Sequence, residues 1–181
     1  VIIGAGVIGC EFATIFSNFG RTKVHLIDRA DRILPFEDND VSELVARNLE
    51  RRGVVIHRNA RLERIEAMPH AIEYDLSYTD GRTERVNVEK ALLSVGRIPN
   101  LENLGLEHIG LELDPITRLL TVDGTRTTQP HVHVVGDASG SNMLVNLGEM
   151  EGRHTVERIF GLQPPALSYA NVSNIMFLDP E

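Results

Sequence analysis

The sequence predicts an α/β protein with a Rossmann-like parallel sheet, and three observations support this fold class. Three β-branched residues at 1–3 run directly into the glycine-rich stretch 4–9, which is typical of a strand, a tight turn and a helix start. Two further apolar runs, at 23–27 and 54–56, predict the next strands. Residues 41–49 repeat apolar side chains on one helical face between those runs. The resulting β-α-β-α-β order requires a parallel sheet with right-handed crossovers.

Two helices are predicted between these strands. The first follows Gly9 and ends near Gly20, because glycine is common just after a helix. The apolar residues expected to face the core from this helix are Ile8, Phe12, Ile15, Phe16 and Phe19. The second helix is expected to begin at Asp40, which can cap it, and to end at Gly53. Its expected core-facing residues are Val41, Leu44, Val45 and Leu49.

Beyond the third strand the pattern changes to that of an antiparallel meander. Strands are expected at 62–67 and 72–78, and residues 79–82 supply a hairpin turn before a third strand that contains Val86 and Val88. This meander is expected to cover one face of the parallel sheet.

The rest of the chain has fewer regular elements. The continuous apolar run at 90–95 predicts a central strand, because such strands are buried on both faces. A strand is expected at 132–135 and a helix at about 142–160. Residues 175–178 are predicted to form an isolated strand without a partner. That orphan strand, together with a start inside a strand and without methionine, suggests a piece of a larger protein.

Composition and charge weigh against several classes of function. Hydrophobic residues make up 42% of the chain and charged residues 24%, which are ordinary values for a soluble globular protein. The net charge of −8 and a pI of about 5.4 oppose binding to nucleic acids or anionic membranes, because phosphate binding needs a basic face. No apolar run approaches the roughly 20 residues of a membrane span. We therefore expect no nucleic-acid partner and no membrane partner.

Cysteine and histidine usage points away from disulfide and metal chemistry. The single cysteine, Cys10, excludes an intramolecular disulfide and suits a reducing cytoplasm. A helix start can lower a thiol pKa, but we favour Cys10 as a small residue packed against the sheet. His131 and His133 lie two residues apart without a third ligand nearby, so they are interpreted as solvent-side histidines. We predict no metal site and a cytoplasmic protein.

The glycines of the first turn have the spacing of a dinucleotide-binding turn. Gly4 allows the sharp turn, Gly6 lets a pyrophosphate approach bare backbone, and Gly9 lets helix and strand pack closely. The helix N-terminus favours an anion there, because its N–H groups are unpaired and its dipole is positive. The residues expected to hold the pyrophosphate are Gly4, Ala5, Gly6, Val7, Ile8 and Gly9.

Asp28 is expected to select the nucleotide. It ends the second apolar run, 19 residues after Gly9, close to the roughly 20-residue spacing of the carboxylate that holds an adenosine ribose. A carboxylate accepts hydrogen bonds from the ribose diol and repels a 2′-phosphate, so Asp28 favours NAD over NADP. Arg29 and Arg32 soften that preference.

Four segments, in their order along the chain, resemble the middle of the pyridine nucleotide-disulfide oxidoreductases, a family of flavoenzymes. Residues 4–11 are similar to the family's NAD(P) motif with its trailing glutamate, and residues 94–100 to the strand that leaves the NAD domain. Residues 134–137 resemble the second FAD motif, and residues 174–181 resemble the start of the dimerisation domain.

This resemblance implies three parts and a further set of site residues. The parts are an NAD(P)-binding Rossmann-like domain at 1–97, the C-terminal part of an FAD-binding domain at 98–165 and the start of a dimerisation domain at 166–181. Glu11 and Gly96 would lie near the nicotinamide, and Leu62 on the adenine side. Asp137 would accept hydrogen bonds from the ribityl chain of the flavin. Val145 falls where the family often has a Leu-Ala-His run at the flavin ring.

The resemblance also implies an activity, which is hydride transfer between NAD(P)H and FAD. The chain contains no first FAD motif, no Cys-x-x-x-x-Cys and no C-terminal His-Glu pair. Alone it is therefore expected to bind NAD(H), to hold FAD poorly and to lack catalytic residues. The intact protein is expected to be a homodimer resembling dihydrolipoamide dehydrogenase. A soluble transhydrogenase-type parent and a nucleotide-binding module without redox chemistry are the alternatives.

Overall fold

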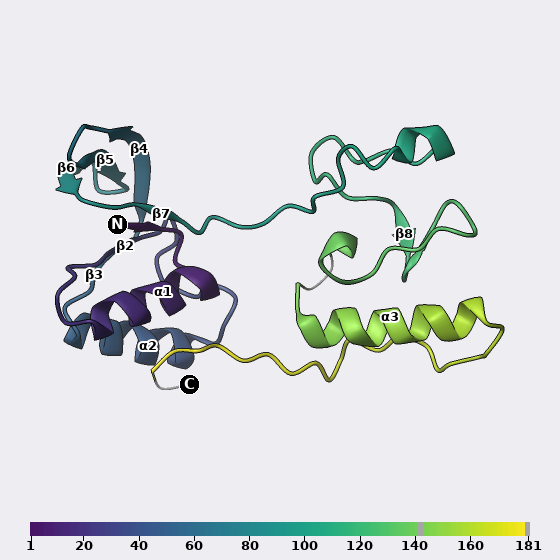
Figure 1. The fold of residues 1–181 in the computed structure, drawn as a ribbon. Coiled ribbons are helices and arrows are strands. Elements are labelled where there is room, and N and C mark those ends of the chain that lie inside the picture. The colour runs from purple at the N-terminus through teal and green to yellow at the C-terminus, as the bar shows by residue number, and fades with distance from the viewer. Residues whose placement is uncertain (141–142, 180–181) are drawn as a thin grey trace. The chain divides into compact units, whose positions relative to one another are not determined.

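The computed structural model describes residues 1–140 and 143–179, and the chain divides into two compact units. One unit comprises Val1–Gly96 together with the C-terminal residues from Ile175, and the other comprises Arg97–Asn174. The first unit carries a parallel sheet, two helices and an antiparallel meander (Figure 1). This arrangement confirms the predicted α/β fold class.

The parallel sheet has four strands in the order β3-β2-β1-β7. The central strands are β1 (Ile2–Ile3) and β2 (His25–Ile27), and both are fully buried because each is paired on both sides and covered on both faces. The edge strands are β3 (Val55–His57) and β7 (Leu92–Leu93). The first three strands pair in parallel, as the sequence predicts.

The prediction of a central strand at 90–95 is wrong. β7 lies at the edge of the sheet, where β1 is its partner among the described strands. Leu93 and Val95 expose 67% and 70% of their surface, so the apolar run is not buried on both faces. A continuous apolar run does not by itself distinguish a central strand from an edge strand whose outer side is bare.

Helices α1 (Val7–Asn18) and α2 (Asn39–Arg51) lie on one face of the sheet (Figure 1). The predicted core face of α1 is correct only in part. Phe12 and Phe16 pack against the main core, whereas Ile8, Ile15 and Phe19 are exposed. The residues that α1 buries are Gly9, Cys10, Ala13, Thr14 and Ser17. At Gly9 no larger residue fits, because a Cβ there would overlap the Gly4 carbonyl oxygen.

The predicted core face of α2 is correct only in part. Val45 and Leu49 are buried as expected, whereas Val41 and Leu44 are exposed. The N-cap is Asp38 instead of Asp40. The early start follows from the fold of the preceding loop, whose Leu34 carbonyl accepts a hydrogen bond from Ser42 at 3.0 Å and thereby orients the first turn.

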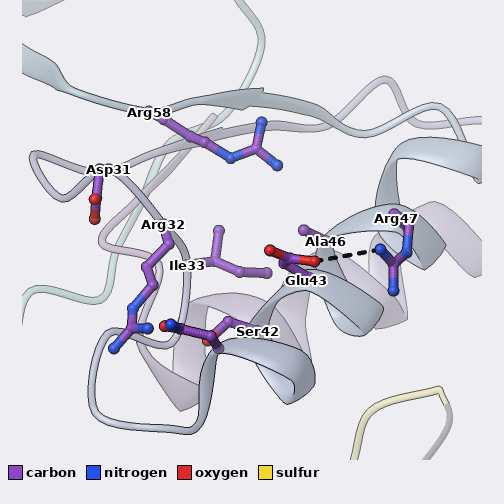
Figure 2. A pocket seen from close by; sticks show the side chains of 9 residues that line it. Asp31, Arg32, Ile33, Ser42, Glu43, Ala46, Arg47 and Arg58 are labelled. Atoms are coloured by element: carbon purple, nitrogen blue, oxygen red, sulfur yellow. Dashed lines mark hydrogen bonds and ion pairs between the residues drawn. The ribbon is translucent and has the colours of Figure 1, made fainter.

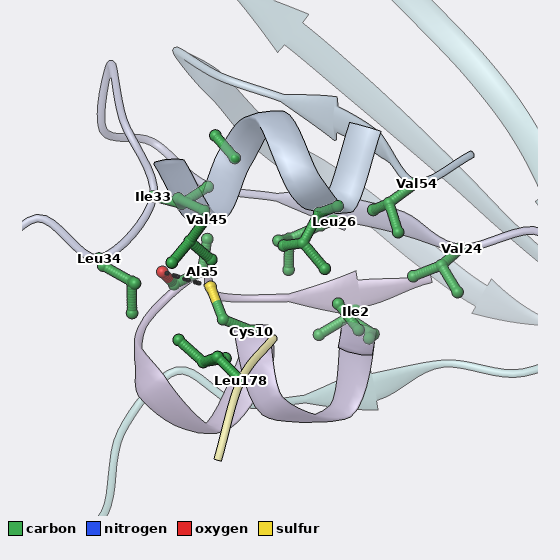
Figure 3. Packing of buried hydrophobic residues seen from close by; sticks show 13 residues of the cluster. Ile2, Ala5, Cys10, Val24, Leu26, Ile33, Leu34, Val45, Val54 and Leu178 are labelled. Atoms are coloured by element: carbon green, nitrogen blue, oxygen red, sulfur yellow. Dashed lines mark hydrogen bonds between the residues drawn. The ribbon is translucent and has the colours of Figure 1, made fainter. Parts of the chain in front are cut away.

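The main core lies between the sheet and these helices (Figure 3). Cys10 is fully buried in it, and its thiol donates a weak hydrogen bond to the Ala5 carbonyl at 3.4 Å. Burial, with smaller contributions from Asp28 and Glu11, raises the pKa of Cys10 to about 12. The thiol therefore stays protonated, and Cys10 acts as a small packing residue, as predicted.

The C-terminal residues complete this core, which corrects the prediction of an isolated strand at 175–178. No strand is assigned there; instead Leu178, which is only 7% exposed, packs among the core residues. The Phe177 N–H donates to Glu11 Oε1 at 3.0 Å, and the Asn48 side-chain amide donates to the Asp179 carbonyl at 3.1 Å. The tail is thus fastened to both helices.

The meander covers the other face of the sheet, as predicted (Figure 1). It consists of β4 (Ala60–Ala67), β5 (Ile72–Tyr78) and β6 (Thr83–Val88), paired antiparallel in this order. Tyr74 and Leu76 of β5 are buried against Ile27 of β2. The alternation of apolar and polar residues in β5 therefore directs one side of the strand to the sheet.

A chain of polar side chains also connects the meander to the sheet. His25 Nδ1 lies 3.0 Å from His57 Nε2, and His57 Nδ1 lies 2.6 Å from the Tyr78 hydroxyl, which donates to Glu84 Oε2 at 2.8 Å. Burial and the neighbouring His57 lower the pKa of His25 to about 4. Burial also lowers the pKa of His57, and Glu84 opposes that shift in part.

The second unit is built mostly from loops. Its elements are the short helices η1 (Leu106–Ile109) and η2 (Gly136–Ser139), the hairpin of β8 (Val122–Asp123) and β9 (Arg126–Thr127), and helix α3 (Val145–Ile159). Its apolar core contains Leu101, Leu111, Leu120 and Val134. The helix predicted at about 142–160 is confirmed as α3, and position 142 lies outside the described residues.

The strand predicted at 132–135 is wrong. This segment makes only an isolated bridge, between His133 and Arg126. β9 pairs instead with β8, and the Thr127 side chain donates a hydrogen bond to the Val132 carbonyl at 2.9 Å. Backbone hydrogen bonds still hold the segment beside β9, because the Val134 N–H donates to the Thr125 carbonyl at 2.8 Å and the Thr127 N–H to the Val132 carbonyl at 3.2 Å. The pairing is too short to form a strand.

Leu178→Ala tests whether the tail is part of the core. We expect it to lower the free energy of unfolding by about 2–5 kcal/mol, because a buried leucine leaves a cavity. Ile175→Ala, in the same tail at 65% exposure, should change it by less than about 0.5 kcal/mol. Urea unfolding measures both, and equal effects would mean that the tail does not pack as described.

The lowered histidine pKa values predict a pH dependence of stability. Between about pH 6.5 and the folded pKa of about 4 for His25, the unfolded chain binds more protons than the folded chain. The stability present above about pH 6.5 is therefore lost as the pH falls. Urea unfolding at several pH values should show a shallower decline for His25→Gln than for the unaltered chain. The matched control is His70→Gln at an exposed loop position, which should leave the slope unchanged.

Candidate dinucleotide-binding site

Two of the three glycines in the first turn are required by the protein's own packing. Gly4 has a φ of +98°, and a Cβ there would lie 2.5 Å from the Ser94 carbonyl oxygen. A Cβ at Gly9 would lie only 1.9 Å from the Gly4 carbonyl oxygen. Any side chain at either position would force the strand, the turn and the helix apart.

Gly6 is different, because nothing in the described protein requires a glycine there. Its φ of −73° is ordinary for any residue, and no heavy atom lies within 4 Å of the position of a Cβ. Gly6 is the N-cap residue of α1, and no side chain of the described residues caps this helix. The turn therefore presents bare backbone and free N–H groups toward open space, which is an arrangement that suits an anion.

Asp28 lies beside this turn, as the sequence predicts for a ribose ligand. Its Oδ2 accepts a hydrogen bond from the Ala5 N–H at 2.6 Å, and its Oδ1 accepts one from the Ala30 N–H at 2.9 Å. A carboxylate has about four lone-pair positions, so two remain for the hydroxyls of a sugar. The backbone fixes the rest of the residue, because the Asp28 N–H donates to the His57 carbonyl and the Asp28 carbonyl accepts from the Ala60 N–H.

Ser94 is a residue of this site that the sequence reasoning missed. Its hydroxyl lies 2.9 Å from the carbonyl oxygens of both Ile3 and Gly4, to which it can donate. Its backbone closes the space beside Gly4, and its side-chain oxygen closes the space beside Gly9. Gly96 follows two residues later with a φ of +121°. The sequence signal was the small polar residue at the end of an apolar strand, next to a glycine.

The other predicted residues of this unit lie in three different surroundings. Glu11 accepts the Phe177 N–H and so holds the tail. Leu62 packs in the apolar cluster beneath the meander. Val7 packs against the main core, whereas Ile8 is exposed.

In the second unit, Asp137 lies in η2 and borders a cavity of about 420 Å³. Arg97 Nη1 donates to its carboxylate at 2.8 Å, and Arg97 Nη2 donates to the Met143 carbonyl at 3.1 Å. Gly136 and Gly148 bring η2 close to α3, because a Cβ at Gly148 would lie 3.2 Å from the Gly136 Cα. A carboxylate at the mouth of a partly apolar cavity suits a ligand that carries hydroxyls. Val145, the first residue of α3, is exposed.

A larger cavity, of about 530 Å³, lies between the loop after β2 and helix α2 (Figure 2). It is lined by Asp31, Arg32, Ile33, Asn39, Ser42, Glu43, Ala46, Arg47 and Arg58. Its arginines have protein partners: Arg47 pairs with Glu43 at 3.4 Å and Arg58 with Glu50 at 2.8 Å. Arg32 donates to the Pro35 carbonyl at 2.8 Å. No predicted site residue lines this cavity, so it is distinct from the turn described above.

The described part of the chain holds neither a cluster of metal ligands nor a helix that could span a membrane. Within residues 1–140 and 143–179, no three histidine, cysteine, aspartate or glutamate side chains come together as metal ligands. None of the helices described in these ranges is long and apolar enough to cross a membrane.

The strand, turn and helix with their adjacent carboxylate are typical of α/β proteins with a Rossmann-like sheet. Residues 1–152 match the pyridine nucleotide-disulphide oxidoreductase family, and the chain belongs to that family. It is 33% identical over 182 residues to a dihydrolipoyl dehydrogenase of Bacillus subtilis, with 100% of this chain and 38% of that protein covered. It is 37% identical over 153 residues to a soluble pyridine nucleotide transhydrogenase of Chromohalobacter salexigens, with 84% and 32% covered.

A solved structure is similar to this chain in fold and in sequence. LpdA from Mycobacterium tuberculosis matches with a TM-score of 0.86 at 30% identity, covering 98% of this chain and 38% of that one. The chain thus spans well under half the length of the proteins it resembles. The matches establish the family of this chain, but they cover too little of the relatives to establish the activity of a whole protein.

Alanine substitutions separate the two kinds of glycine. Gly9→Ala should lower the free energy of unfolding by at least about 3 kcal/mol, because the methyl group would overlap the Gly4 carbonyl. Gly6→Ala should leave it within about 1 kcal/mol of the unaltered value, because its φ suits alanine and its surroundings are open. Urea unfolding measures both, and a large loss of stability in Gly6→Ala would contradict the open space at this turn.

Proposed function

We propose that this chain is the NAD(H)-binding central part of a flavin-dependent oxidoreductase that transfers a hydride between NAD(P)H and FAD, and that its parent resembles dihydrolipoyl dehydrogenase. The single observation that carries the proposal is Gly6. A glycine that neither conformation nor packing requires, at an uncapped helix start beside Asp28, is explained by a ligand that needs the bare backbone.

The residues of the first unit would hold the dinucleotide. The N–H groups at the start of α1 would bind the pyrophosphate, between Gly4 and Gly9, while Ala5, Val7 and Ile8 form the rest of that turn. Asp28 would accept hydrogen bonds from the adenosine ribose. By likeness to the family, Leu62 would lie toward the adenine, and Glu11 and Gly96 toward the nicotinamide.

The second unit would contribute to the FAD site of the parent protein. FAD, when bound, supplies the hydride acceptor, because no amino-acid side chain accepts a hydride. Asp137 would accept hydrogen bonds from ribityl hydroxyls at the mouth of its cavity, with Arg97 fixing the orientation of the carboxylate. Val145 would lie near the flavin. The parent would be a cytoplasmic homodimer, as its likeness to the family implies.

A second candidate is a parent of the soluble transhydrogenase type, which the 37% identity to such an enzyme favours. Asp28 argues for the first candidate, because a carboxylate at the ribose disfavours NADP. A redox pair of cysteines in the parent reading frame would favour a dithiol-linked enzyme, and its absence would favour the transhydrogenase. A third reading, a binding module without redox chemistry, requires a parent without any FAD motif.

Isothermal titration of the chain with NADH and NADPH tests the nucleotide preference. We expect NADH to bind more tightly by about tenfold or more, because the Asp28 carboxylate repels a 2′-phosphate. Asp28→Asn keeps the shape and removes the charge, so it should shrink that gap. The matched control is Asp31→Ala, three residues along the same loop, which should preserve it.

Gly6→Ala is the second variant for this titration. It should lower the affinities for NADH and NADPH alike by about tenfold or more, without changing the ratio of the two affinities. Equal affinities of NADH and NADPH in the unaltered chain would remove the role of Asp28. Undiminished binding by Gly6→Ala would show that the pyrophosphate does not lie at this turn.

A further inference from the structure

The four side chains that join the meander to the sheet form a hydrogen-bond chain with a single direction. The Tyr78 hydroxyl has one proton and donates it to the Glu84 carboxylate, so it can only accept from His57 Nδ1. His57 therefore carries its proton on Nδ1, and its Nε2 is an acceptor. His25 must then donate from Nδ1 to that nitrogen. The exposed carboxylate thus sets the tautomers of two buried imidazoles.

The same histidine holds Asp28 through its backbone. The His57 carbonyl accepts the Asp28 N–H at 3.0 Å, directly after the pairing of His57 with Ile27. The Asp28 carbonyl accepts the N–H of Ala60, which is buried in the cluster beneath the meander. The end of β3 and the start of β4 therefore determine where the Asp28 backbone lies, and with it the carboxylate beside the glycine turn.

We propose that His25, His57, Tyr78 and Glu84 form a directional relay that positions Asp28 for the ribose and makes dinucleotide binding sensitive to pH. This inference rests on the proposed function, because it concerns the regulation of dinucleotide binding at the same site. A proton taken up by His57 would convert its Nε2 from an acceptor to a donor. Two N–H groups would then face each other across the 3.0 Å between His25 and His57. The pair must then reorient, separate or move the His25 proton from Nδ1 to Nε2. Reorientation or separation displaces the end of β3 that holds Asp28.

The charges around His57 influence the pH at which it takes up that proton. The titratable and charged groups that act on the two imidazoles or on their partners are Lys23, Tyr74, Tyr78, Asp80, Arg82, Glu84 and the amino group of Val1. Burial and Arg82 disfavour the charged form of His57, whereas Glu84 favours it. At neutral pH both imidazoles are thus neutral, and acidification is the signal to which the relay responds.

The relay has a signature that does not involve the nucleotide. Nitrogen-15 NMR of the chain at about pH 7.5 should find both His25 and His57 protonated on Nδ1 and deprotonated on Nε2. A proton on Nε2 of either ring would overturn the direction of the chain and the proposal with it.

Titration of the chain with NAD⁺, which is stable in acid, tests the coupling. Affinity should fall by about fivefold or more between about pH 7.5 and about pH 5. Glu84→Gln keeps an acceptor for Tyr78 but removes the charge that favours protonated His57, so it should retain more affinity at the lower pH. Tyr78→Phe should lower the affinity already at the higher pH, because it breaks the relay. His70→Gln, at an exposed loop position in the same unit, should behave like the unaltered chain.

The outcomes separate this inference from the proposed function. Binding of NAD⁺ that is the same at both pH values, and unaffected by Tyr78→Phe, would overturn the relay as a control while leaving the dinucleotide site in place. No binding of NAD⁺ at either pH would overturn the proposed function and the coupling together, while the tautomers would still report on the hydrogen-bond chain.

Discussion

The first unit depends on the close approach of helix α1 to the strand that precedes it. Gly9 lies against the Gly4 carbonyl and the Ser94 side chain at a distance that excludes any Cβ. The residues that α1 buries fully are all small, and its Phe12 and Phe16 pack against the core while partly exposed. The contact at Gly9 also places the start of the helix next to β7 and Asp28, so that packing and the candidate binding site share one set of backbone contacts.

Much of the fold could be predicted, because the residues that specify it act locally. The glycine turn, the β-α-β-α-β order and the hairpin at 79–82 depend on spacings within a few residues of one another, and the structure contains all three. Asp28 could be located for the same reason. It directly follows the second strand, and the carboxyl ends of parallel strands lie at the same edge of the sheet as the glycine turn. Its contact with the Ala5 N–H agrees with that placement.

The errors arise where distant parts of the chain meet. Nothing in the apolar stripe of α1 reveals that its small residues are the ones fully buried, and nothing in the run at 90–95 reveals that one side of β7 is bare. Ser94 and the pair His25 and His57 were missed similarly, because their partners lie 32 to 91 residues away. Sequence periodicity indicates which face of an element is apolar, but the neighbour determines which face is covered.

The tail that carries Leu178 makes the first unit discontinuous along the chain. After Gly96 the chain forms the second unit, Arg97–Asn174, and then contributes its C-terminal residues to the first unit again. These residues supply the buried Leu178 and the Phe177 N–H that Glu11 accepts. The ends of a long intervening segment must therefore be brought together before the core is complete, at an entropic cost that grows slowly with segment length. Excising residues 1–96 as a stand-alone binding domain would remove Leu178 from this core and expose the apolar side chains that it packs against.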